Sequence, residues 1–261
     1  MYNIDEIYWP VIELAKKIGE YQKSYFRSEN MKMSTKSTDV DFVTEVDLAC
    51  DRMIVDQLSE WFAGDTILSE EQGLAKGTGK YSWIIDPLDG TTNFSIGHPI
   101  FAVSIARWKG DKPVFGVVYV PMLDELFYAQ SGKGAYMNHV MISKKEPVEM
   151  GQAVLATGFP YDRATAHNNN SENVAKMVPK VKGIRRLGAA AYDLCLVAAG
   201  VLDAYWELRL GWWDMAAGML MITEAGRSFT FTKEDEKYNV VCGDESLCET
   251  LINELNMENG I

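Results

Sequence analysis

The chain has 261 residues, and 47% of them are hydrophobic, which is enough for a globular protein with a substantial core. Its 37 acidic residues outnumber its 25 basic ones, and the formal net charge of −12 argues against a general affinity for nucleic acid or anionic lipid. No segment approaches the roughly 20 apolar residues of a membrane span, and the acid-containing N-terminus is unlike a signal peptide, so we expect a cytoplasmic protein.

The cysteine and histidine counts narrow the chemistry further. Four cysteines occur without CxxC spacing, which predicts reduced structural thiols. Only three histidines are present, and this argues against a histidine-based phosphatase or a histidine-ligated zinc site. Oxygen-ligand chemistry is therefore favoured.

Apolar periodicity organises the first half of the chain. It predicts an amphipathic helix over residues 4–26, a polar loop over residues 28–40, and a second helix that begins near Thr44 and ends by Gly64. Thr44 can cap this second helix through its hydroxyl. Short apolar runs between turn residues then predict sheet, with strands at residues 66–68, 83–85, 101–108, 114–120 and 125–129.

The second half alternates between strands and helices, which predicts stacked helix and sheet layers. Predicted strands cover residues 153–157, 203–207, 228–231 and 239–242; predicted helices cover residues 168–178 and 189–199, and two more begin at Asp214 and near Glu245. We expect one domain over residues 1–261. A junction near residues 147–151 would divide it into an N-terminal half, 1–148, and a C-terminal half, 149–261.

The strongest local signal is the segment WIIDPLDGTTNF, in which an apolar strand delivers two aspartates at its end. Asp86 and Asp89 flank a Pro-Leu turn, so their carboxylates can converge, and the Leu88 carbonyl can add a third oxygen. Hard cations such as Mg²⁺ prefer these ligands. Gly90 and Thr91 can open a helix whose free N–H groups face a phosphate. The same residues are also typical of a solvated β-turn, and the segment alone leaves both interpretations open.

Two further acidic features stand at the ends of predicted elements. Glu70 and Glu71 follow a strand in ILSEEQG, and Asp214 precedes a small-residue helix in GWWDMAAG. Each has an ordinary explanation, a solvated pair for the glutamates and an N-cap for the aspartate. Strand-end carboxylates at three distant places nevertheless match the needs of a site for about two or three cations. The combination favours a metal site.

These motifs together resemble those of the inositol monophosphatase family. The resemblance rests on Glu70-Glu71, Asp86-Pro87-Leu88-Asp89-Gly90-Thr91 and Trp213-Asp214-Met215-Ala216-Ala217-Gly218, and it extends to Val43-Thr44-Glu45-Val46-Asp47, Gly188-Ala189-Ala190 and Glu207. Order and spacing agree from about residue 35 to residue 226. Ser69 is a departure, because many members carry glycine before the two glutamates.

The resemblance implies an α/β (α+β) fold, a layered α-β-α-β-α sandwich of the inositol monophosphatase and sugar phosphatase type, often assembled as a homodimer. It also implies magnesium-dependent, lithium-sensitive hydrolysis of a small phosphate monoester by a metal-activated water. Inositol monophosphate is the first candidate substrate.

Residue roles follow from the same resemblance. Glu70, Glu71, Asp86, the Leu88 carbonyl, Asp89 and Asp214 would hold two or three Mg²⁺ ions; Asp47, Thr91 and Glu70 would be catalytic; Gly90 and Thr91 would bind phosphate; and Asp89, Gly188, Ala190 and Glu207 would face the alcohol. Lys36 resembles a mobile-loop lysine near the metals and is equally consistent with a surface lysine. Without the resemblance, Thr44 and Asp47 would form a helix-capping pair, and Glu207 would pair with Arg209.

Several alternatives stay open. Enzymes for fructose bisphosphate, histidinol phosphate, the 2′-phosphate of NADP or a 3′-phosphoadenosine nucleotide could share this metal site, and Arg185, Arg186 and Arg209 would then receive a second phosphate or an adenosine. Otherwise these arginines would pair at the surface. A phosphate-binding module without catalysis is a different class, and the complete acidic set argues against it. GxGxxG and GxxxxGK[ST] motifs are absent, which argues against a redox or nucleotide enzyme of another fold. The resemblance implies a small phosphorylated polyol, sugar or nucleotide as partner.

Overall fold

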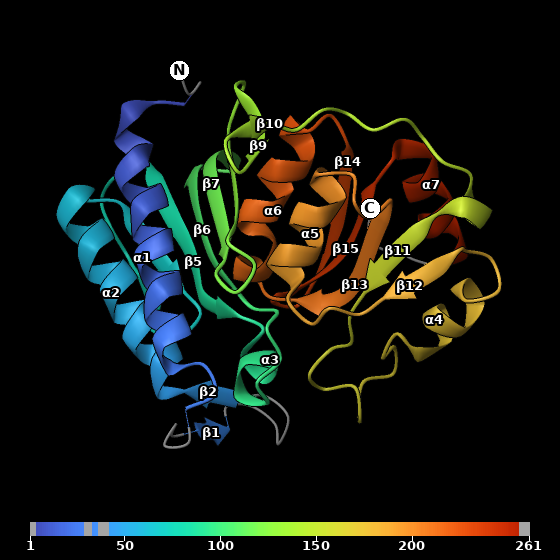
Figure 1. Ribbon diagram of the computed structural model, residues 1–261, viewed down its shortest axis with the longest axis horizontal. Helices are drawn as coiled ribbons and strands as arrows, with labels where there is room; N and C mark the ends of the chain where they lie inside the picture. Colours follow the sequence, from blue (N-terminus) through green and yellow to red (C-terminus); the bar gives the residue numbers. More distant parts are fainter. Residues whose placement is uncertain (1–3, 29–32, 36–41, 256–261) are drawn as a thin grey trace.

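The computed structural model describes residues 4–28, 33–35 and 42–255, and it stacks helices and sheets in five layers (Figure 1). Helices α1 (Trp9–Tyr25) and α2 (Glu45–Trp61) cover the outer face of a first sheet. Helices α5 (Ala190–Ala198) and α6 (Trp212–Glu224) lie between this sheet and a second one. The outer face of the second sheet carries α4 (Ser171–Met177) and α7 (Glu245–Glu254). The expected α-β-α-β-α sandwich is confirmed.

The first sheet has eight strands in the order β10-β9-β8-β7-β6-β5-β3-β4. Helices cover both faces of its centre, so β5 is buried from Trp83 onward, and its apolar run Trp83-Ile84-Ile85 precedes Asp86. Its pairing with β6 becomes irregular between Asp86 and Asp89, at the carboxyl end of the strand. The strands are β3 (Thr66–Ser69), β4 (Gly73–Ala75), β5 (Tyr81–Asp89), β6 (Ala102–Lys109), β7 (Lys112–Val120), β8 (Glu125–Gln130), β9 (Gly134–Met137) and β10 (Val140–Met141).

The second sheet has five strands in the order β12-β11-β13-β15-β14. Its strand β11 pairs in parallel with β12 and β13, whereas β15 runs antiparallel to β13 and β14. A register shift between Glu207 and Leu210 interrupts the pairing of β13 with β15. The strands are β11 (Val154–Thr157), β12 (Gly183–Arg185), β13 (Ala204–Leu210), β14 (Ser228–Glu234) and β15 (Lys237–Gly243).

The predicted polar loop over residues 28–40 is wrong in part. Strand β1 (Met33–Thr35) pairs antiparallel with β2 (Phe42–Thr44), and residues 29–32 and 36–41, which include Lys36, lie outside the described residues. The strands β4, β9, β10 and β12 were not predicted either. Each has only two to four residues, too few for an alternating pattern to show. Two short 3₁₀ turns, Glu6–Tyr8 and Met150–Gln152, complete the elements before α1 and β11.

Two predicted helix starts have different outcomes. Thr44 is the N-cap of α2, as expected, and its hydroxyl accepts hydrogen bonds from the Val46 and Asp47 amides. Asp214 is not the N-cap of α6, because that helix already begins at Trp212. The Asp214 carboxylate instead accepts a 2.6 Å bond from the Gly211 amide within the first turn. Asp214 is thereby held at the N-terminal end of α6.

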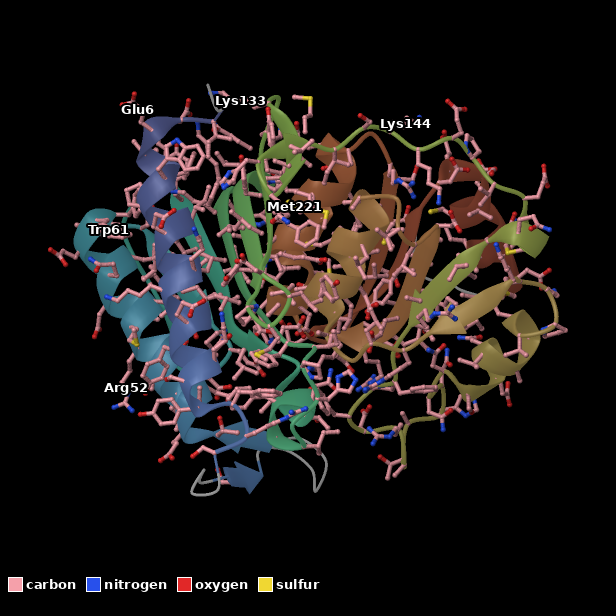
Figure 2. The ribbon with its side chains drawn as sticks, viewed as in Figure 1. Glu6, Arg52, Trp61, Lys133, Lys144 and Met221 are labelled. Atoms are coloured by element: carbon pink, nitrogen blue, oxygen red, sulfur yellow. The ribbon has the colours of Figure 1, made fainter. Side chains whose placement is uncertain are left out.

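The main core covers both faces of the first sheet: it lies under α1 and α2 on the outer face and around α5 and α6, between the two sheets, on the inner face. Met221 of α6 is fully buried there, whereas Trp61, at the end of α2, is 40% exposed on the outer layer (Figure 2). A smaller cluster around Trp206 and Leu251 attaches α4 and α7 to the second sheet.

The four cysteines are buried and unpaired, as expected. Within the described part of the chain, no helix is both long and apolar enough to cross a membrane. The division into one domain or two halves stays a prediction.

Candidate active site

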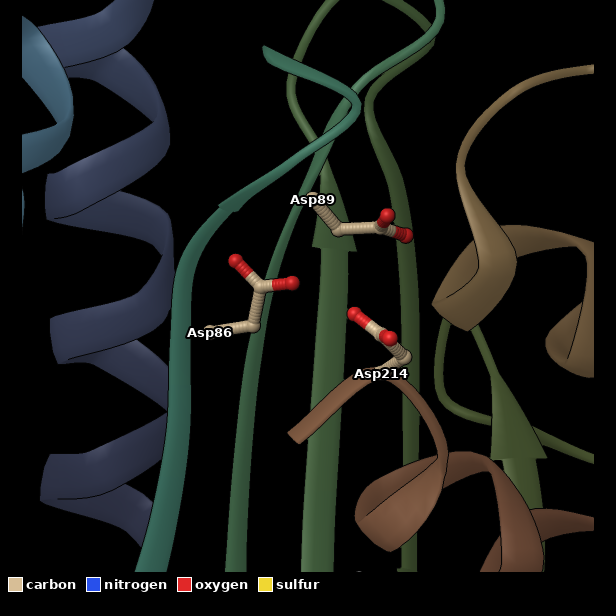
Figure 3. A group of neighbouring side chains, drawn as sticks. All are labelled: Asp86, Asp89 and Asp214. Carbon is tan, nitrogen blue, oxygen red and sulfur yellow. The ribbon is translucent and has the colours of Figure 1, made fainter. Parts of the chain in front are cut away.

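Three aspartates from two distant segments meet between the sheets. Asp86 and Asp89 come from the irregular end of β5, and Asp214 comes from the first turn of α6 (Figure 3). One carboxylate oxygen of each lies within 4.8 Å of those of the other two. Since like charges this close repel and all three offer oxygen ligands, the group is suited to a hard divalent cation.

The three aspartates line a cavity of about 510 Å³. The sequence-predicted residues Glu70, Leu88, Gly90 and Thr91 line the same cavity, and so do Gly188, Ala190 and Glu207 from the second half of the chain. The cavity is therefore formed jointly by β5 and α3 (Thr91–Ser95) on one side and by α5, β13 and α6 on the other.

Asp89 links the two halves of the site. Its two carboxylate oxygens accept hydrogen bonds from the amides of Ala190, at 3.1 Å, and Ala191, at 2.7 Å, at the start of α5. Burial raises the pKa of Asp89 to about 7 against the effect of these bonds, and the nearby Glu70 raises it further. Its charged form is thus destabilised when no cation is present.

The charged form of Asp214 is destabilised in the same way. Burial raises its pKa to about 8, and the charges of Glu70 and Asp89 add to the effect. The bond from the Gly211 amide opposes this rise without cancelling it. The acidic cluster is therefore incompletely compensated by protein donors.

A hydrogen-bonded chain runs from the start of α2 to the start of α3. Thr91 Oγ1 lies 2.8 Å from Asp47 Oδ1 and 3.1 Å from the Leu88 carbonyl oxygen. The other Asp47 oxygen accepts from the Thr44 amide, at 3.0 Å, and from the Thr44 hydroxyl. Asp47 and Thr44 thus form a capping box and also hold Thr91, so the capping and the catalytic interpretations describe the same contacts.

Gly90 occupies a position that only glycine fills without strain. Its φ is 91°, in the left-handed region, and a Cβ atom would lie 3.0 Å from the Ile100 carbonyl oxygen and 3.2 Å from that of Gly188. The residue starts α3 beside the cavity. Residues 90 and 188 therefore approach each other closely, and this contact joins the side of the cavity formed by β5 and α3 to the side formed by α5, β13 and α6.

Glu207 does not pair with Arg209. Arg209 instead forms an ion pair with Asp162, at 2.9 Å, and Glu207 accepts a hydrogen bond from the Tyr205 hydroxyl. Burial raises the pKa of Glu207 to about 7, partly opposed by Tyr205. The Glu207 carboxylate therefore lines the cavity without a cationic partner on its own strand.

Not every sequence-predicted residue lines this cavity. Glu71 follows Glu70 but is outside the lining, and so is Asp47, which lies 1% exposed behind Thr91. Ser69, the departure from the family pattern, is buried and donates a hydrogen bond to Asp51 of α2. This bond ties the end of β3 to the helix layer.

Sequence reasoning missed two polar residues at or near the cavity, Lys237 and Asp193. Arg163 and Lys237 contribute to the lining together with Arg186 and Arg209, whereas Arg185 does not. In the described part of the chain, Arg163, Arg186 and Lys237 form no ion pair within 4.0 Å, although the charge of Arg186 lowers the pKa of Glu207 and that of Lys237 lowers the pKa of Asp214. Asp193 of α5 is buried, and burial together with the Glu207 and Asp89 charges raises its pKa well above the usual range. No motif marked Lys237 or Asp193, because only the folded chain brings Lys237 to the cavity and Asp193 within reach of the Glu207 and Asp89 charges.

The fold and the site define a layered α/β protein with a cluster of oxygen ligands at the base of a substrate-sized cavity. The family model described as "Inositol monophosphatase family" matches residues 3–258. The chain belongs to the inositol monophosphatase family, which supports a phosphatase, a hydrolase. The family is metal-dependent, and the chain has an acidic cluster of the kind that can hold a metal ion.

Individual relatives agree with this placement. An inositol-1-monophosphatase of Caulobacter vibrioides is 38% identical over 242 residues, which is 91% of this chain and 93% of that protein. The Nus factor SuhB of Vibrio cholerae is 42% identical over 222 residues, which is 84% of this chain and 82% of that protein. Relatives of this chain are therefore named either inositol-1-monophosphatase or Nus factor SuhB.

Solved structures share the whole fold. The extragenic suppressor protein SuhB of Bartonella henselae superposes with a TM-score of 0.86 at 36% identity, over 96% of this chain and 98% of the other. An inositol monophosphatase from Anabaena gives 0.82 at 30% identity, over 95% and 96%. A structure of SaIMPase-II with bound inositol monophosphate gives 0.79 at 25% identity, over 95% and 93%.

Proposed function

We propose that this protein is a magnesium-dependent phosphatase that hydrolyses inositol monophosphate, or a closely similar polyol phosphate, to the alcohol and phosphate. The observation that carries the proposal is the convergence of Asp86, Asp89 and Asp214 in the cavity, with oxygens within 4.8 Å of one another. Relatives named inositol-1-monophosphatase and a structural neighbour that binds inositol monophosphate support the choice of substrate.

The donor set fits Mg²⁺. Carboxylate and carbonyl oxygens are the ligands that Mg²⁺ prefers, and Asp86, Asp89, Asp214, Glu70 and the Leu88 carbonyl supply them around one cavity. Glu71 would support a more weakly held ion, for about two or three ions in total. Bound Mg²⁺ supplies positive charge that activates water and offsets the charge of the phosphate. A cation would also relieve the repulsion among the buried carboxylates.

The protein's own residues would orient the reaction. Asp47 accepts a hydrogen bond from Thr91, and this fixes the Thr91 hydroxyl beside the Leu88 carbonyl. Thr91 would then position a water for in-line attack on phosphorus, with Glu70 beside it. The amides of Gly90 and Thr91, at the start of α3, would hold the phosphate oxygens.

The alcohol portion of the substrate would lie toward the second half of the chain. The Glu207 carboxylate forms no ion pair within 4.0 Å among the described residues, and Gly188, Ala190 and Asp89 line the adjoining wall. A carboxylate is a strong acceptor for hydroxyl groups. This wall would therefore recognise a polyol.

A second candidate is a substrate with an additional phosphate, such as NADP or fructose bisphosphate. Arg163, Arg186 and Lys237 favour it, since these cavity residues carry positive charge without an ion-pair partner among the described residues. Histidinol phosphate and 3′-phosphoadenosine nucleotides are further alternative substrates. A non-catalytic phosphate-binding module is the non-enzyme alternative.

We also propose that the protein is cytoplasmic, works as a homodimer and has no general affinity for membranes or nucleic acid. The net charge of −12 supports the last point. A mobility-shift assay with nucleic acid tests this expectation, and the relatives named Nus factor SuhB make partners other than the substrate a further subject of experiment. Light scattering of the purified protein tests the dimer.

A substrate panel tests the proposed function. Phosphate release should be measured with inositol monophosphate, fructose bisphosphate, NADP, histidinol phosphate and a 3′-phosphoadenosine nucleotide under excess Mg²⁺, with and without added Li⁺. We expect the highest kcat/KM for inositol monophosphate, loss of turnover in EDTA, recovery on adding Mg²⁺, and inhibition by Li⁺. Full turnover in EDTA with trace metals excluded would refute the metal dependence. A clear preference for a bisphosphate would instead support the second candidate, a substrate with an additional phosphate.

A further inference from the structure

A buried polar side chain lies where the outer helix layer meets the acidic cluster. Gln22 is on the inner face of α1, which otherwise buries apolar residues such as Val11, Ile12 and Ile18, and Gln22 itself is fully buried. Its Nε2 atom donates a 2.7 Å hydrogen bond to the carbonyl oxygen of Pro87, which is 65 positions away in the sequence.

Stability alone does not account for an amide at this position. Burying an amide is unfavourable unless both of its polar ends are bonded, and Gln22 Oε1 has no hydrogen-bond partner among the described residues. A leucine or methionine of similar size would remove the unbonded Oε1 but would leave the Pro87 carbonyl without its donor, so the two effects on stability oppose each other. The bond from Nε2 to Pro87 is therefore the feature of Gln22 that an apolar residue would lose.

The peptide that receives this bond lies between two metal-ligand candidates. The pairing of β5 with β6 is irregular between Asp86 and Asp89, so this stretch of backbone is not fixed by a regular ladder. The same planar peptide carries the Pro87 carbonyl, bonded to Gln22, and the Leu88 amide, which donates a 3.0 Å bond to Asp86 Oδ1. Both polar ends of the peptide are thus bonded.

The two bonds together restrict rotation of the peptide plane. A rotation would remove Leu88 N–H from Asp86 Oδ1 and would turn the next carbonyl, that of Leu88, which lies 3.1 Å from Thr91 Oγ1. The orientation of Asp86 and of the Leu88 carbonyl therefore depends on the bond to the Pro87 carbonyl, the acceptor end of this peptide, as well as on the bond from the Leu88 amide, its donor end. Gln22 holds the acceptor end.

We infer that Gln22 is a positioning residue, which holds the Pro87–Leu88 peptide from behind so that Asp86 and the Leu88 carbonyl face the cation. The inference rests on the proposed function, because it assumes that these oxygens bind Mg²⁺. It adds a contribution from α1, a helix that supplies none of the cavity lining.

The test compares Gln22→Leu and Gln22→Met with Ile18→Val. The first two variants remove the donor and keep the volume, whereas Ile18→Val removes one methyl group from the same helix face, one turn away from the bond. Mg²⁺ binding to the full chain should be measured by calorimetry without substrate, together with the Mg²⁺ concentration for half-maximal turnover. Urea unfolding in EDTA gives the stability of each variant.

We expect both Gln22 variants to bind Mg²⁺ roughly 2- to 10-fold more weakly, which is the range that one hydrogen bond contributes, with little change in stability in EDTA. Ile18→Val should lose stability and keep the wild-type affinity for Mg²⁺. Unchanged Mg²⁺ affinity in both Gln22 variants would overturn the inference. So would a loss of folding in EDTA in both, since a structural role would then be sufficient. Absence of Mg²⁺ binding by the wild type would overturn the proposed metal dependence, and this inference with it.

Discussion

Asp89 combines two tasks in one side chain. It is a member of the acidic cluster, and both of its oxygens also accept bonds from the start of α5. A substitution at this residue should therefore separate the energetics of catalysis from those of folding.

We expect Asp89→Asn to lower turnover by about 100- to 1,000-fold, the effect typical of losing one preorganised electrostatic contributor. Stability in EDTA should fall by no more than about 1–3 kcal/mol, because asparagine accepts only one of the two amide bonds from α5 but also removes a buried charge whose pKa is raised to about 7. Phosphate release and urea unfolding measure the two effects. Asp162→Asn, a carboxylate outside the acidic cluster, is the control. A stability loss as large as the activity loss would indicate a structural role for Asp89.

Glu207 is the second residue whose role can be isolated. Its carboxylate lines the cavity, and Arg209 is engaged by Asp162 instead. Glu207→Gln should lower kcat/KM for a polyol phosphate by about 10- to 100-fold, since a hydrogen bond to a charged group contributes roughly 1.5–3 kcal/mol. Hydrolysis of nitrophenyl phosphate, which has no hydroxyls to recognise, should be nearly unchanged. Equal losses for both substrates would count against recognition of the alcohol.

At the scale of elements, the start of α2 serves both folding and the site. Thr44 caps the helix and bonds to Asp47, which in turn holds Thr91 of α3. Helix α7 has a comparable cap, in which Asp244 accepts a 3.1 Å bond from the Ser246 amide, far from the cavity lining. The two caps form a matched pair for experiment.

Thr44→Val and Asp244→Ala should each lower the free energy of unfolding by about 0.5–2 kcal/mol, the usual contribution of a capping side chain. Only Thr44→Val should also lower kcat, because Asp47 then loses one of the groups that orient it. Urea unfolding and steady-state kinetics of both variants give the comparison. Equal kcat values in the two variants would show that the cap of α2 has no catalytic consequence.

At the scale of the whole molecule, the acidic cluster should make stability depend on pH when metal is absent. The pKa of Asp214 is raised from 3.8 to about 8, and that of Asp89 to about 7, so the folded state holds protons that the unfolded state releases. The resulting stability is present below the unfolded pKa and is lost as the pH rises through the folded pKa. Metal-free protein should become less stable between about pH 4 and pH 8.

Thermal unfolding in EDTA across this pH range tests the effect. We expect the Tm of Asp214→Asn to exceed that of the wild type increasingly toward pH 8, because the asparagine carries no charge to bury. Added Mg²⁺ should raise the Tm of the wild type most at the alkaline end, since the ion binds the folded state. A difference between the two proteins that stays constant with pH would contradict the buried titration of Asp214.

The sequence predicted most of the elements because their patterns are long. Enough apolar residues recur in the segments that form α1, α2, β6 and β7 for a helical or strand period to be recognised. The short strands β1, β2 and β12 are stabilised by their neighbours and carry no pattern of their own, so they were missed. Helix α6 was placed two residues late, since its start is set by contacts of Gly211 and Asp214 and not by a capping side chain.

The sequence by itself determined the family, the layered fold and the chemical type of the site, because these depend on local motifs such as Asp86 to Thr91 and on their order along the chain. Only the tertiary structure decided which side chains meet. It paired Arg209 with Asp162, placed Lys237 at the cavity and joined Gln22 to Pro87. The reason is physical: a motif fixes the conformation of adjacent residues, whereas contacts between distant segments depend on how the layers pack and on which partner each buried polar group finds.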